Sequence, residues 1–308
     1  MRVTETRLTS MSTGEFAEDQ KPSPPRILVG VDGSDDAMRA VMYALGTAER
    51  TGHDIWLVHA VDDGVLTSGW GVVYDPTILS SVGEEALAVA KLFLSDNGFP
   101  AERVRSEVLM GHPTAVLADL SESAELCVVG RRAAGGLDRM FIGSTSLSLG
   151  GSAHCPVVVI SAASTPGRTG AHKRIAVAVT VPDKAKHQVE WALQEARDRN
   201  CALVVAHVVA PAPTGLFAAF KAAPTPEATA KARAALGEML AGLRKVYPDV
   251  EIEGEILEGM PIAELVNQTG TIDLLVLGIH PNPVTGMSFG GPLRGILAHS
   301  LCPVCLVR

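Results

Sequence analysis

Residues 126–146 read Leu-Cys-Val-Val-Gly-Arg-Arg-Ala-Ala-Gly-Gly-Leu-Asp-Arg-Met-Phe-Ile-Gly-Ser-Thr-Ser. The apolar run that ends at Gly130 predicts a buried strand, the glycine-rich stretch predicts a loop, and a helix is expected to begin near Ser144. Such a loop brings backbone N–H groups, hydroxyls and the positive end of a helix dipole to one place, which suits a phosphate. The segment therefore predicts an anion-binding loop, although similar loops also occur where a chain only turns.

The composition sets limits on the fold class and on the partners. The chain has 308 residues, which is enough for two domains, and 47% of them are apolar while 19% are charged. These values favour an α/β protein whose parallel sheets are buried on both faces. A net charge of -8 argues against nucleic-acid and membrane partners. Five cysteines do not resemble a disulfide framework, so we expect a cytoplasmic location.

The first 25 residues differ from the rest of the chain. Residues 1–25 are polar and end in a proline-rich stretch, so they are predicted to form a disordered tail rather than a signal peptide. A candidate membrane span at residues 274–293 is interrupted by three prolines. We therefore expect no membrane-spanning segment.

The two halves of the chain match each other at an offset of 148 residues. The matched pairs are Ile27 with Ile175, Val29 with Val177, Val31 with Val179, His59 with His207, Gly111 with Gly259, Pro113 with Pro261, Gly130 with Gly278 and Gly143 with Gly291. Such a repeat predicts two copies of one domain. We place them at residues 26–161 and 174–308, joined by a linker at residues 162–173.

Strand and helix patterns alternate within the first copy. A continuous apolar strand at residues 27–32 precedes Ser34, a typical helix-capping residue, and the next helix carries one apolar face. The same order of patterns continues to Pro113, which suits the first turn of a third helix. The alternation predicts an open, doubly wound parallel sheet with helices on both faces. Its ligand crevice is expected at the carboxyl ends of the strands, where Asp32 and Gly130 lie.

Two segments resemble signatures of one family. Gly130-x2-Ala133-x9-Gly143-Ser144 resembles the Gly-x2-Gly-x9-Gly-Ser/Thr motif of the universal stress proteins, and residues 27–34 resemble their first strand with its aspartate on the adenosine side. The resemblance extends from Arg26 to Arg308, so the chain is similar to a tandem universal stress protein. It implies a five-stranded, Rossmann-like sheet of the adenine-nucleotide α-hydrolase-like kind in each half. It also implies ATP, alone or with Mg²⁺, bound across the first and fourth strands.

The resemblance assigns roles to residues around the crevice of the first copy. Adenine and ribose would lie against the ends of the first two strands, and the phosphates would lie on the loop and the helix after it. The candidates are Val31, Asp32 and Ala60 on the adenosine side, and Gly130, Gly143, Ser144, Thr145 and Ser146 on the phosphate side. Arg131 is added because its positive charge can meet a phosphate. Ala133 departs from the motif, and alanine at a position with φ > 0 would cost about 1 kcal/mol.

The second copy lacks several of these groups. Thr180 stands where Asp32 stands in the first copy, which removes the carboxylate that would accept from ribose hydroxyls. Pro292 stands at the position of Ser144, which removes a hydroxyl and a backbone N–H from the helix start. We expect this site to be degenerate and its domain to have a structural role. Residues 211–229 are expected to cover the mouth of its crevice.

Other candidate motifs have structural interpretations. Cys302 and Cys305 have redox spacing but fall on a terminal apolar strand, and the two histidines His59 and His207 lie within apolar runs, which favours core positions. No cluster has metal-ligand spacing, and there is no GxxxxGK[ST] motif. No catalytic residue is therefore assigned.

Three functions remain open at this point. The chain is expected to be an ATP-binding regulatory protein of the stress response, with a nucleotide-free interaction module or a slow ATPase as alternatives. The apolar ends at residues 156–160 and 303–307 are predicted to be edge strands that pair with each other or across chains. The expected assembly is an internal pseudo-dimer or a homodimer.

Overall fold

The computed structural model of the protein describes residues 25–62, 76–131, 144–164, 171–179, 186–211, 223–279 and 291–308. The first half contains β1 (Arg26–Gly30), α1 (Asp35–Thr51), β2 (Asp54–Val61), α2 (Pro76–Asp96), η2 (Ala101–Arg103), β3 (Val104–Met110), α3 (Pro113–Leu120), η3 (Ser121–Ser123), β4 (Leu126–Gly130), α4 (Ser144–Ser152) and β5 (Val157–Ile160). The second half contains β6 (Arg174–Ala178), α5 (Lys186–Arg199), β7 (Ala202–Val209), α6 (Pro226–Val246), β8 (Ile252–Glu258), α7 (Pro261–Gln268), β9 (Leu274–Gly278), α8 (Gly291–His299) and β10 (Val304–Val307).

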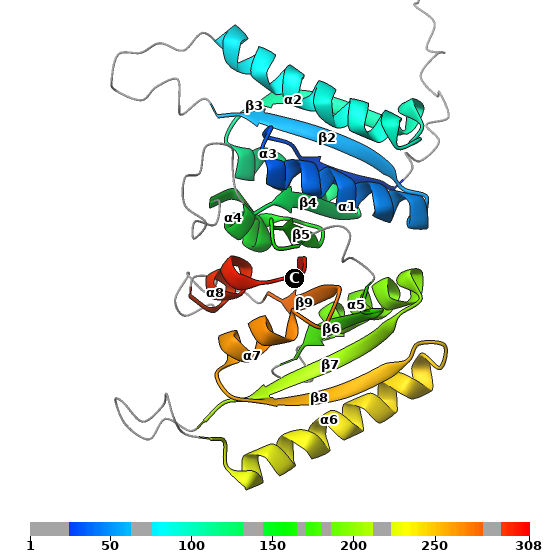
Figure 1. The fold of residues 1–308 in the computed structure, drawn as a ribbon, viewed down its shortest axis with the longest axis vertical. Coiled ribbons are helices and arrows are strands. Elements are labelled where there is room, and N and C mark those ends of the chain that lie inside the picture. Colours follow the sequence, from blue (N-terminus) through cyan, green and yellow to red (C-terminus); the bar gives the residue numbers. More distant parts are fainter. Residues whose placement is uncertain are drawn as a thin grey trace, which may run out of the picture.

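The strands form one ten-stranded sheet in the order β3-β2-β1-β4-β5-β10-β9-β6-β7-β8. Within each half the five strands are parallel, and the two halves join where β5 pairs with β10 in the antiparallel sense. Figure 1 shows the two halves one above the other, with the C-terminus in the middle. The predicted fold, two tandem doubly wound parallel sheets with helices on both faces, is confirmed.

Helices cover the two faces of the sheet in the same way in both halves. One hydrophobic cluster packs the sheet against α1, α2, α5 and α6, and the other packs it against α3, α4, α7 and α8. Helix α1 shows how the sequence directs this arrangement. Ser34 caps its start by accepting from the N–H of Ala37 at 3.1 Å, and Gly52 ends it with φ 74°. Its buried face includes Ala40 and Ala44, so the helix packs closely on the strands.

The antiparallel pair β5–β10 lies at the centre of the molecule. Val158 is opposite Cys305 and Val159 is opposite Val304, and all four side chains are buried. The predicted terminal edge strands thus pair with each other within one chain. Because the edges of both half-sheets are used here, the two halves share continuous cores on both faces.

A buried polar network crosses between the halves from α1 to α5. The Nη2 of Arg199 donates to the phenolic oxygen of Tyr43 at 2.5 Å, and its Nε donates to Glu195 at 2.6 Å. Arg50 of the first half lies 3.5 Å from the same carboxylate. Burial raises the pKa of Tyr43 well above its usual range. The paired charges satisfy one another, which is the condition for tolerating them away from water.

The two cysteines near the C-terminal strand are buried, as a structural role requires. Cys302 and Cys305 pack in the clusters on opposite faces of the sheet, and burial raises the pKa of Cys302 to about 12.

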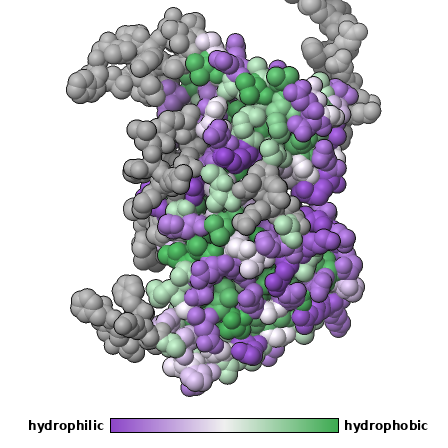
Figure 2. All heavy atoms as spheres, viewed as in Figure 1, coloured by the Kyte–Doolittle hydropathy of each residue, from purple (hydrophilic) through white to green (hydrophobic). Residues whose placement is uncertain are grey.

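Hydrophilic and hydrophobic residues are interspersed over both halves on the face shown in Figure 2. Among the described residues, no helix is both long and apolar enough to cross a bilayer.

We expect Val158→Asp to lower the free energy of unfolding by about 3 to 5 kcal/mol, because it places an unpaired charge at the junction of the halves. Val158 is 0% exposed, whereas Val82 on the outer side of α2 is 53% exposed. Val82→Asp is the matched control and should change the free energy by no more than about 0.5 kcal/mol. Urea denaturation measures both, and equal effects would contradict the central position of β5–β10.

Candidate functional site

The strand order reverses between β1 and β4, and we take the carboxyl ends of these two strands as the candidate crevice. From β1 the chain adds β2 and β3 on one side, then crosses over to add β4 and β5 on the other. Ile27 pairs with Leu126 and Val29 with Val128, so the two strands end side by side. Ligands of doubly wound sheets bind at such a point. The turns that leave β1 and β4 are therefore the walls of the candidate site.

Asp32 lies in the turn between β1 and α1. Its Oδ1 accepts a hydrogen bond from the N–H of Ser34 at 2.9 Å, and its side chain is partly exposed. Ser34 in turn caps α1. The capped turn thus fixes the position of a carboxylate at the mouth of the crevice.

Val31 directly follows β1 and is buried. Its side chain is buried, its N–H donates to the carbonyl of Val58 at 2.8 Å, and its carbonyl is 2.7 Å from Nδ1 of His59. Val31 therefore has its backbone groups bonded and packs in the core. The same bond recurs in the second half, where Nδ1 of His207 lies 2.8 Å from the carbonyl of Val179. Both histidines thus tie the second strand of each half to the first.

Ala60 lies near the carboxyl end of β2 and is partly exposed. It follows Trp56 and Val58 at alternate positions, so it is on the face of the sheet that α3 covers. A small side chain here leaves room beside the end of β1.

Gly130 ends β4 at a point of close backbone contact. A Cβ at this position would lie 2.7 Å from the carbonyl carbon of Asp36 and 2.8 Å from the amide nitrogen of Ala37. Only glycine therefore lets the first turn of α1 pack onto the end of β4. This contact brings the two walls of the crevice together.

Ser146 and Thr145 belong to the first turn of α4. The hydroxyl of Ser146 is 2% exposed and donates to the carbonyl of Gly130 at 2.7 Å, so it ties α4 to the end of β4. Thr145 is partly exposed, and Ser144 is the first residue of the helix. The positions of Gly143 and Ala133 lie outside the described residues.

Arg131 differs from the sequence-based expectation. Its guanidinium is 6% exposed, and Nη1 donates to the carbonyls of Leu297 and Ala298 near the end of α8 in the second half. The side chain therefore does not project to a phosphate position but crosses the junction between the halves. The repeat gave no indication of this role, because Ile279 stands at the corresponding position.

In the second half, a side chain that the sequence did not point to packs on the carboxyl ends of the corresponding strands, β6 and β9. Gln188 of α5 is 5% exposed, and its Nε2 donates to the carbonyl of Ala178 at the end of β6. A Cβ on Gly278 would lie 1.4 Å from its Oε1, so the amide packs directly on the end of β9. In the first half the matched residue is Ala40, and this difference in size was the available signal. Thr180 and Pro281 lie outside the described residues.

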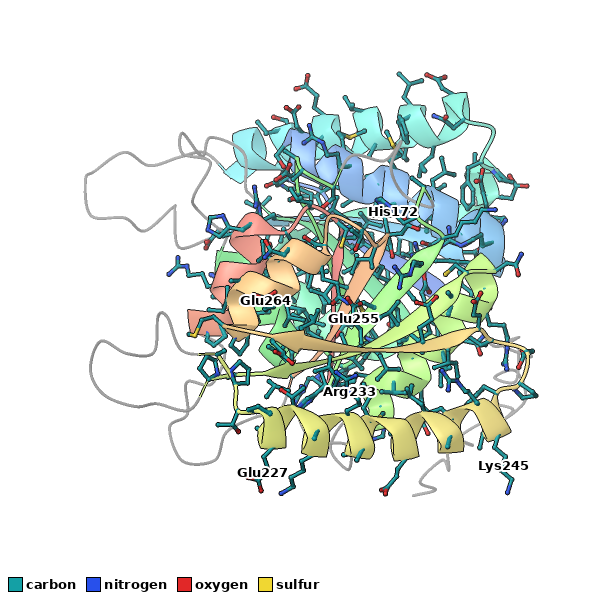
Figure 3. The ribbon with its side chains drawn as sticks, turned by 60° about the horizontal axis from the view of Figure 1, so that its bottom comes forward. His172, Glu227, Arg233, Lys245, Glu255 and Glu264 are labelled. Carbon is teal, nitrogen blue, oxygen red and sulfur yellow. The ribbon has the colours of Figure 1, made fainter. Side chains whose placement is uncertain are left out.

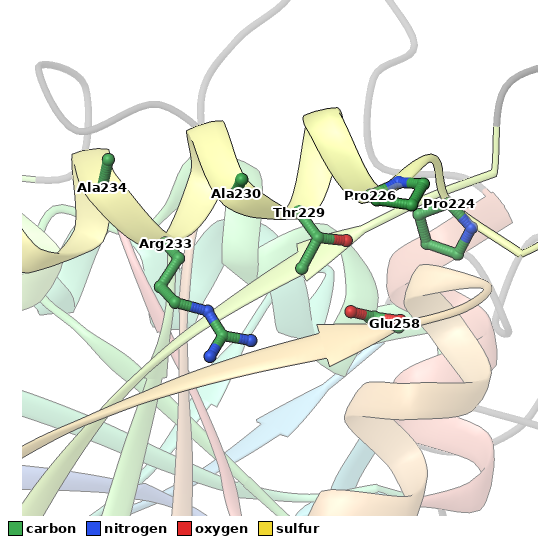
Figure 4. Close-up of a pocket in the computed structure, with 7 residues that line it drawn as sticks. All are labelled: Pro224, Pro226, Thr229, Ala230, Arg233, Ala234 and Glu258. Atoms are coloured by element: carbon green, nitrogen blue, oxygen red, sulfur yellow. The ribbon is translucent and has the colours of Figure 1, made fainter.

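A separate open groove lies at the far edge of the second half. It has a volume of about 630 Å³ between the N-terminal part of α6 and the end of β8, with Arg233 and Glu258 among its lining residues (Figure 4). Figure 3 shows Glu227 and Lys245 at opposite ends of α6 on its outer side. The groove is remote from the β1–β4 crevice, because β8 is the last strand of the sheet. No group of His, Cys, Asp or Glu suited to hold a metal ion occurs among the described residues.

Comparisons with known proteins agree with this architecture. A model of the universal stress protein family matches residues 25–161 and again residues 171–308. A universal stress protein of Mycolicibacterium smegmatis is 31% identical over 298 residues, which cover 92% of this chain and 96% of the relative. One of Mycobacterium tuberculosis is 28% identical with the same coverage. The crystal structure of a universal stress protein from Archaeoglobus fulgidus matches with a TM-score of 0.67 at 18% identity, covering 92% of this chain and 98% of that one.

The sequence repeat, the ten-stranded sheet built from two equivalent halves and the two family matches describe the same organisation. A relative at 31% identity covers nearly the whole chain. The chain belongs to the universal stress protein family, with two of the family's domains in tandem.

Proposed function

We propose that the protein binds ATP in the β1–β4 crevice of its first half and acts as a cytoplasmic regulatory module of the stress response. The observation that supports this is the side-by-side pairing of β1 and β4 at the point where the strand order reverses. It brings the carboxylate of Asp32 and the start of α4 to the two walls of one crevice.

The adenosine side of the proposed site depends on Asp32. A carboxylate accepts hydrogen bonds from two ribose hydroxyls, and the N–H of Ser34 holds this one in place before a ligand arrives. Ala60 offers a small, partly exposed side chain beside it for the adenine ring. Val31 is buried, and its side chain packs in the core beneath this side of the proposed site.

The phosphate side depends on the first turn of α4. The first N–H groups of a helix have no partner within it, and the helix dipole is positive there. Gly143, Ser144 and Thr145 are the residues that we propose to contact the phosphates. The hydroxyl of Ser146 donates a hydrogen bond to the carbonyl of Gly130. We therefore propose that Ser146 holds the helix in place and does not contact the phosphates. Arg131 is no longer included, because its guanidinium is bonded to α8. We propose no protein ligand for Mg²⁺, which would enter with the phosphates.

The second half is proposed to have no nucleotide site. Gln188 occupies the end of the β6–β9 seam, where the first half has Ala40. Pro292 lacks the N–H that the matched position of the first half offers. We therefore keep the division into a nucleotide-binding domain at residues 26–161 and a degenerate domain at residues 174–308.

Binding without rapid hydrolysis fits the titratable groups near the crevice better than an ATPase. Asp32 supplies the carboxylate of the β1–α1 turn. The imidazole of His59 is hydrogen-bonded through Nδ1 to the carbonyl of Val31. A general base must reach the attacking water, but the side of the ring that carries Nε2 packs against Gly83 of α2, where a Cβ would lie 3.1 Å from Nε2. The nucleotide-free alternative is distinguished by testing a denatured extract of the purified protein for adenine nucleotide.

Asp32→Ala should weaken ATP binding by about 1 to 3 kcal/mol, because it removes the acceptor for the ribose hydroxyls. Isothermal titration calorimetry on the full chain measures the change. Asp35→Ala is the matched control, since it removes the same charge from the exposed start of the same helix. Unchanged affinity in the Asp32 variant would show that the nucleotide lies elsewhere.

Ser144→Ala should weaken ATP binding by a similar amount, roughly 1 to 3 kcal/mol, through loss of a hydroxyl donor to the phosphates. Ala133→Gly should leave the affinity unchanged or increase it, because glycine restores the residue of the family's motif and adopts positive and negative φ with little cost. Calorimetry again reports both values. Tighter binding after Ser144→Ala would contradict the proposed phosphate position.

The intact chain should bind one ATP rather than two, because only the first half keeps both walls of the crevice. Calorimetric stoichiometry tests this on the full protein, which is the correct sample because the halves share their cores. Gln188→Ala should still bind a single ATP, since Pro292 remains at the helix start. Two equivalent sites in the parent protein would overturn the proposed asymmetry.

A further inference from the structure

Helix α4, which we propose to bind the phosphates, lies against the second half of the protein. A Cβ on Gly150 would lie 2.7 Å from Cδ1 of Leu306 and 3.0 Å from Cδ1 of Ile279. Both leucine and isoleucine belong to the second half, so the helix backbone itself packs on that half. A displacement of the second half would therefore move α4.

Arg131 connects the end of β4 to the second half. Its Nη1 donates to the carbonyl of Leu297 at 3.1 Å and also to that of Ala298. These carbonyls lie in the last turn of α8, where helix carbonyls lack partners and the dipole favours a cation. The same residue is tied to α4 as well, because its carbonyl is 3.4 Å from the hydroxyl of Ser146.

Arg308 makes the reciprocal contact from the second half. Its Nη1 donates to the carbonyl of Ala153 at 3.2 Å, directly after the end of α4. The positive charge again lies at the negative end of a helix dipole. An arginine from each half therefore binds the C-terminal end of a helix in the other half.

Arg131 and Ile279 stand at matched positions of the repeat, and each extends its side chain into the other half. The N–H of Arg131 donates to the carbonyl of Ile160, and the N–H of Ile279 donates to that of Val307, so both residues extend their strand ladders equally. The arginine side chain then reaches α8, and the isoleucine side chain reaches α4 at Gly150. The residue after β4 and the last turn of α4 thus both contact the second half.

We infer that the degenerate second half positions α4 for the nucleotide, and that Arg131 and Arg308 are positioning residues for the site in the first half. The inference rests on the proposed ATP site. The donors of a helix start stabilise a phosphate only when the helix is correctly oriented, and the contacts at Gly150, Ala153 and Arg131 fix that orientation. By thermodynamic reciprocity, bound ATP also stabilises the docking of the two halves.

Calorimetry with ATP on full-length variants tests the inference. Arg131→Ala and Arg308→Ala should each weaken binding by about fivefold or more, although neither side chain is placed against the ligand. Arg131→Lys keeps the positive charge at the end of α8 and should have intermediate affinity. Arg244→Ala is the control, because its guanidinium also binds a backbone carbonyl, that of Ile252, but entirely within the second half. This control should bind ATP as the parent does.

A second measurement separates positioning from general destabilisation. Amide hydrogen exchange in residues 147–153 should become faster in the Arg131→Ala and Arg308→Ala variants without nucleotide, and should stay at the parent rate in Arg244→Ala. In the parent, ATP should slow exchange in the last turn of α8 as well as in α4. Arg308→Ala is the decisive variant, because Arg308 is exposed at the chain end and its loss should not prevent folding.

The outcomes separate this inference from the proposed function. If the parent binds ATP and both alanine variants bind it equally tightly, the inference is wrong and the proposed function stands. If the parent does not bind ATP, the proposed function is wrong and the inference falls with it. Weaker binding that Arg244→Ala reproduces would also overturn the inference, because the effect would then not depend on the junction.

Discussion

The antiparallel pairing of β5 with β10 is the constraint on which the rest of the structure depends. Each half-sheet would otherwise end in an apolar strand with unpaired backbone groups. Pairing the two edges within one chain satisfies those groups and makes both hydrophobic clusters continuous across the junction. The halves therefore form one folding unit even though each is a complete doubly wound sheet.

This constraint accounts for a difference between two parts of the repeat. The end strands β5 and β10 are alike in both halves, whereas the residues near the carboxyl ends of β1–β4 and β6–β9 differ. The end strands recur in both copies because they pair with each other across the junction. Gly130 and Gly278 recur because each ends a strand on which another segment packs too closely for a Cβ. The crevice of the second half has no such requirement. It accommodates Gln188 where the first half has Ala40, and the amide finds its own partner in the carbonyl of Ala178. The buried amide is in this way accommodated with a hydrogen-bond partner for its Nε2.

Charged groups buried at the junction make directional hydrogen bonds in addition to the hydrophobic contacts between the halves. Arg199, Glu195 and Tyr43 bond one another between α1 and α5, and Arg131 bonds the end of α8. Buried ion pairs contribute little net stability, because desolvation offsets much of their attraction. Their directional bonds instead specify one arrangement of the halves, which apolar packing alone would leave less defined.

The sequence alone was sufficient for the repeat and the parallel α/β fold, because these follow from the internal match of the two halves and from the periodicity of their apolar residues. It also indicated the loss of groups in the second copy. Tertiary structure alone decided where side chains point: Arg131 donates to α8, Ser146 donates to Gly130, and Gln188 donates to Ala178. Local patterns specify strands and helices, but a side chain's partner depends on which distant segment the fold brings beside it.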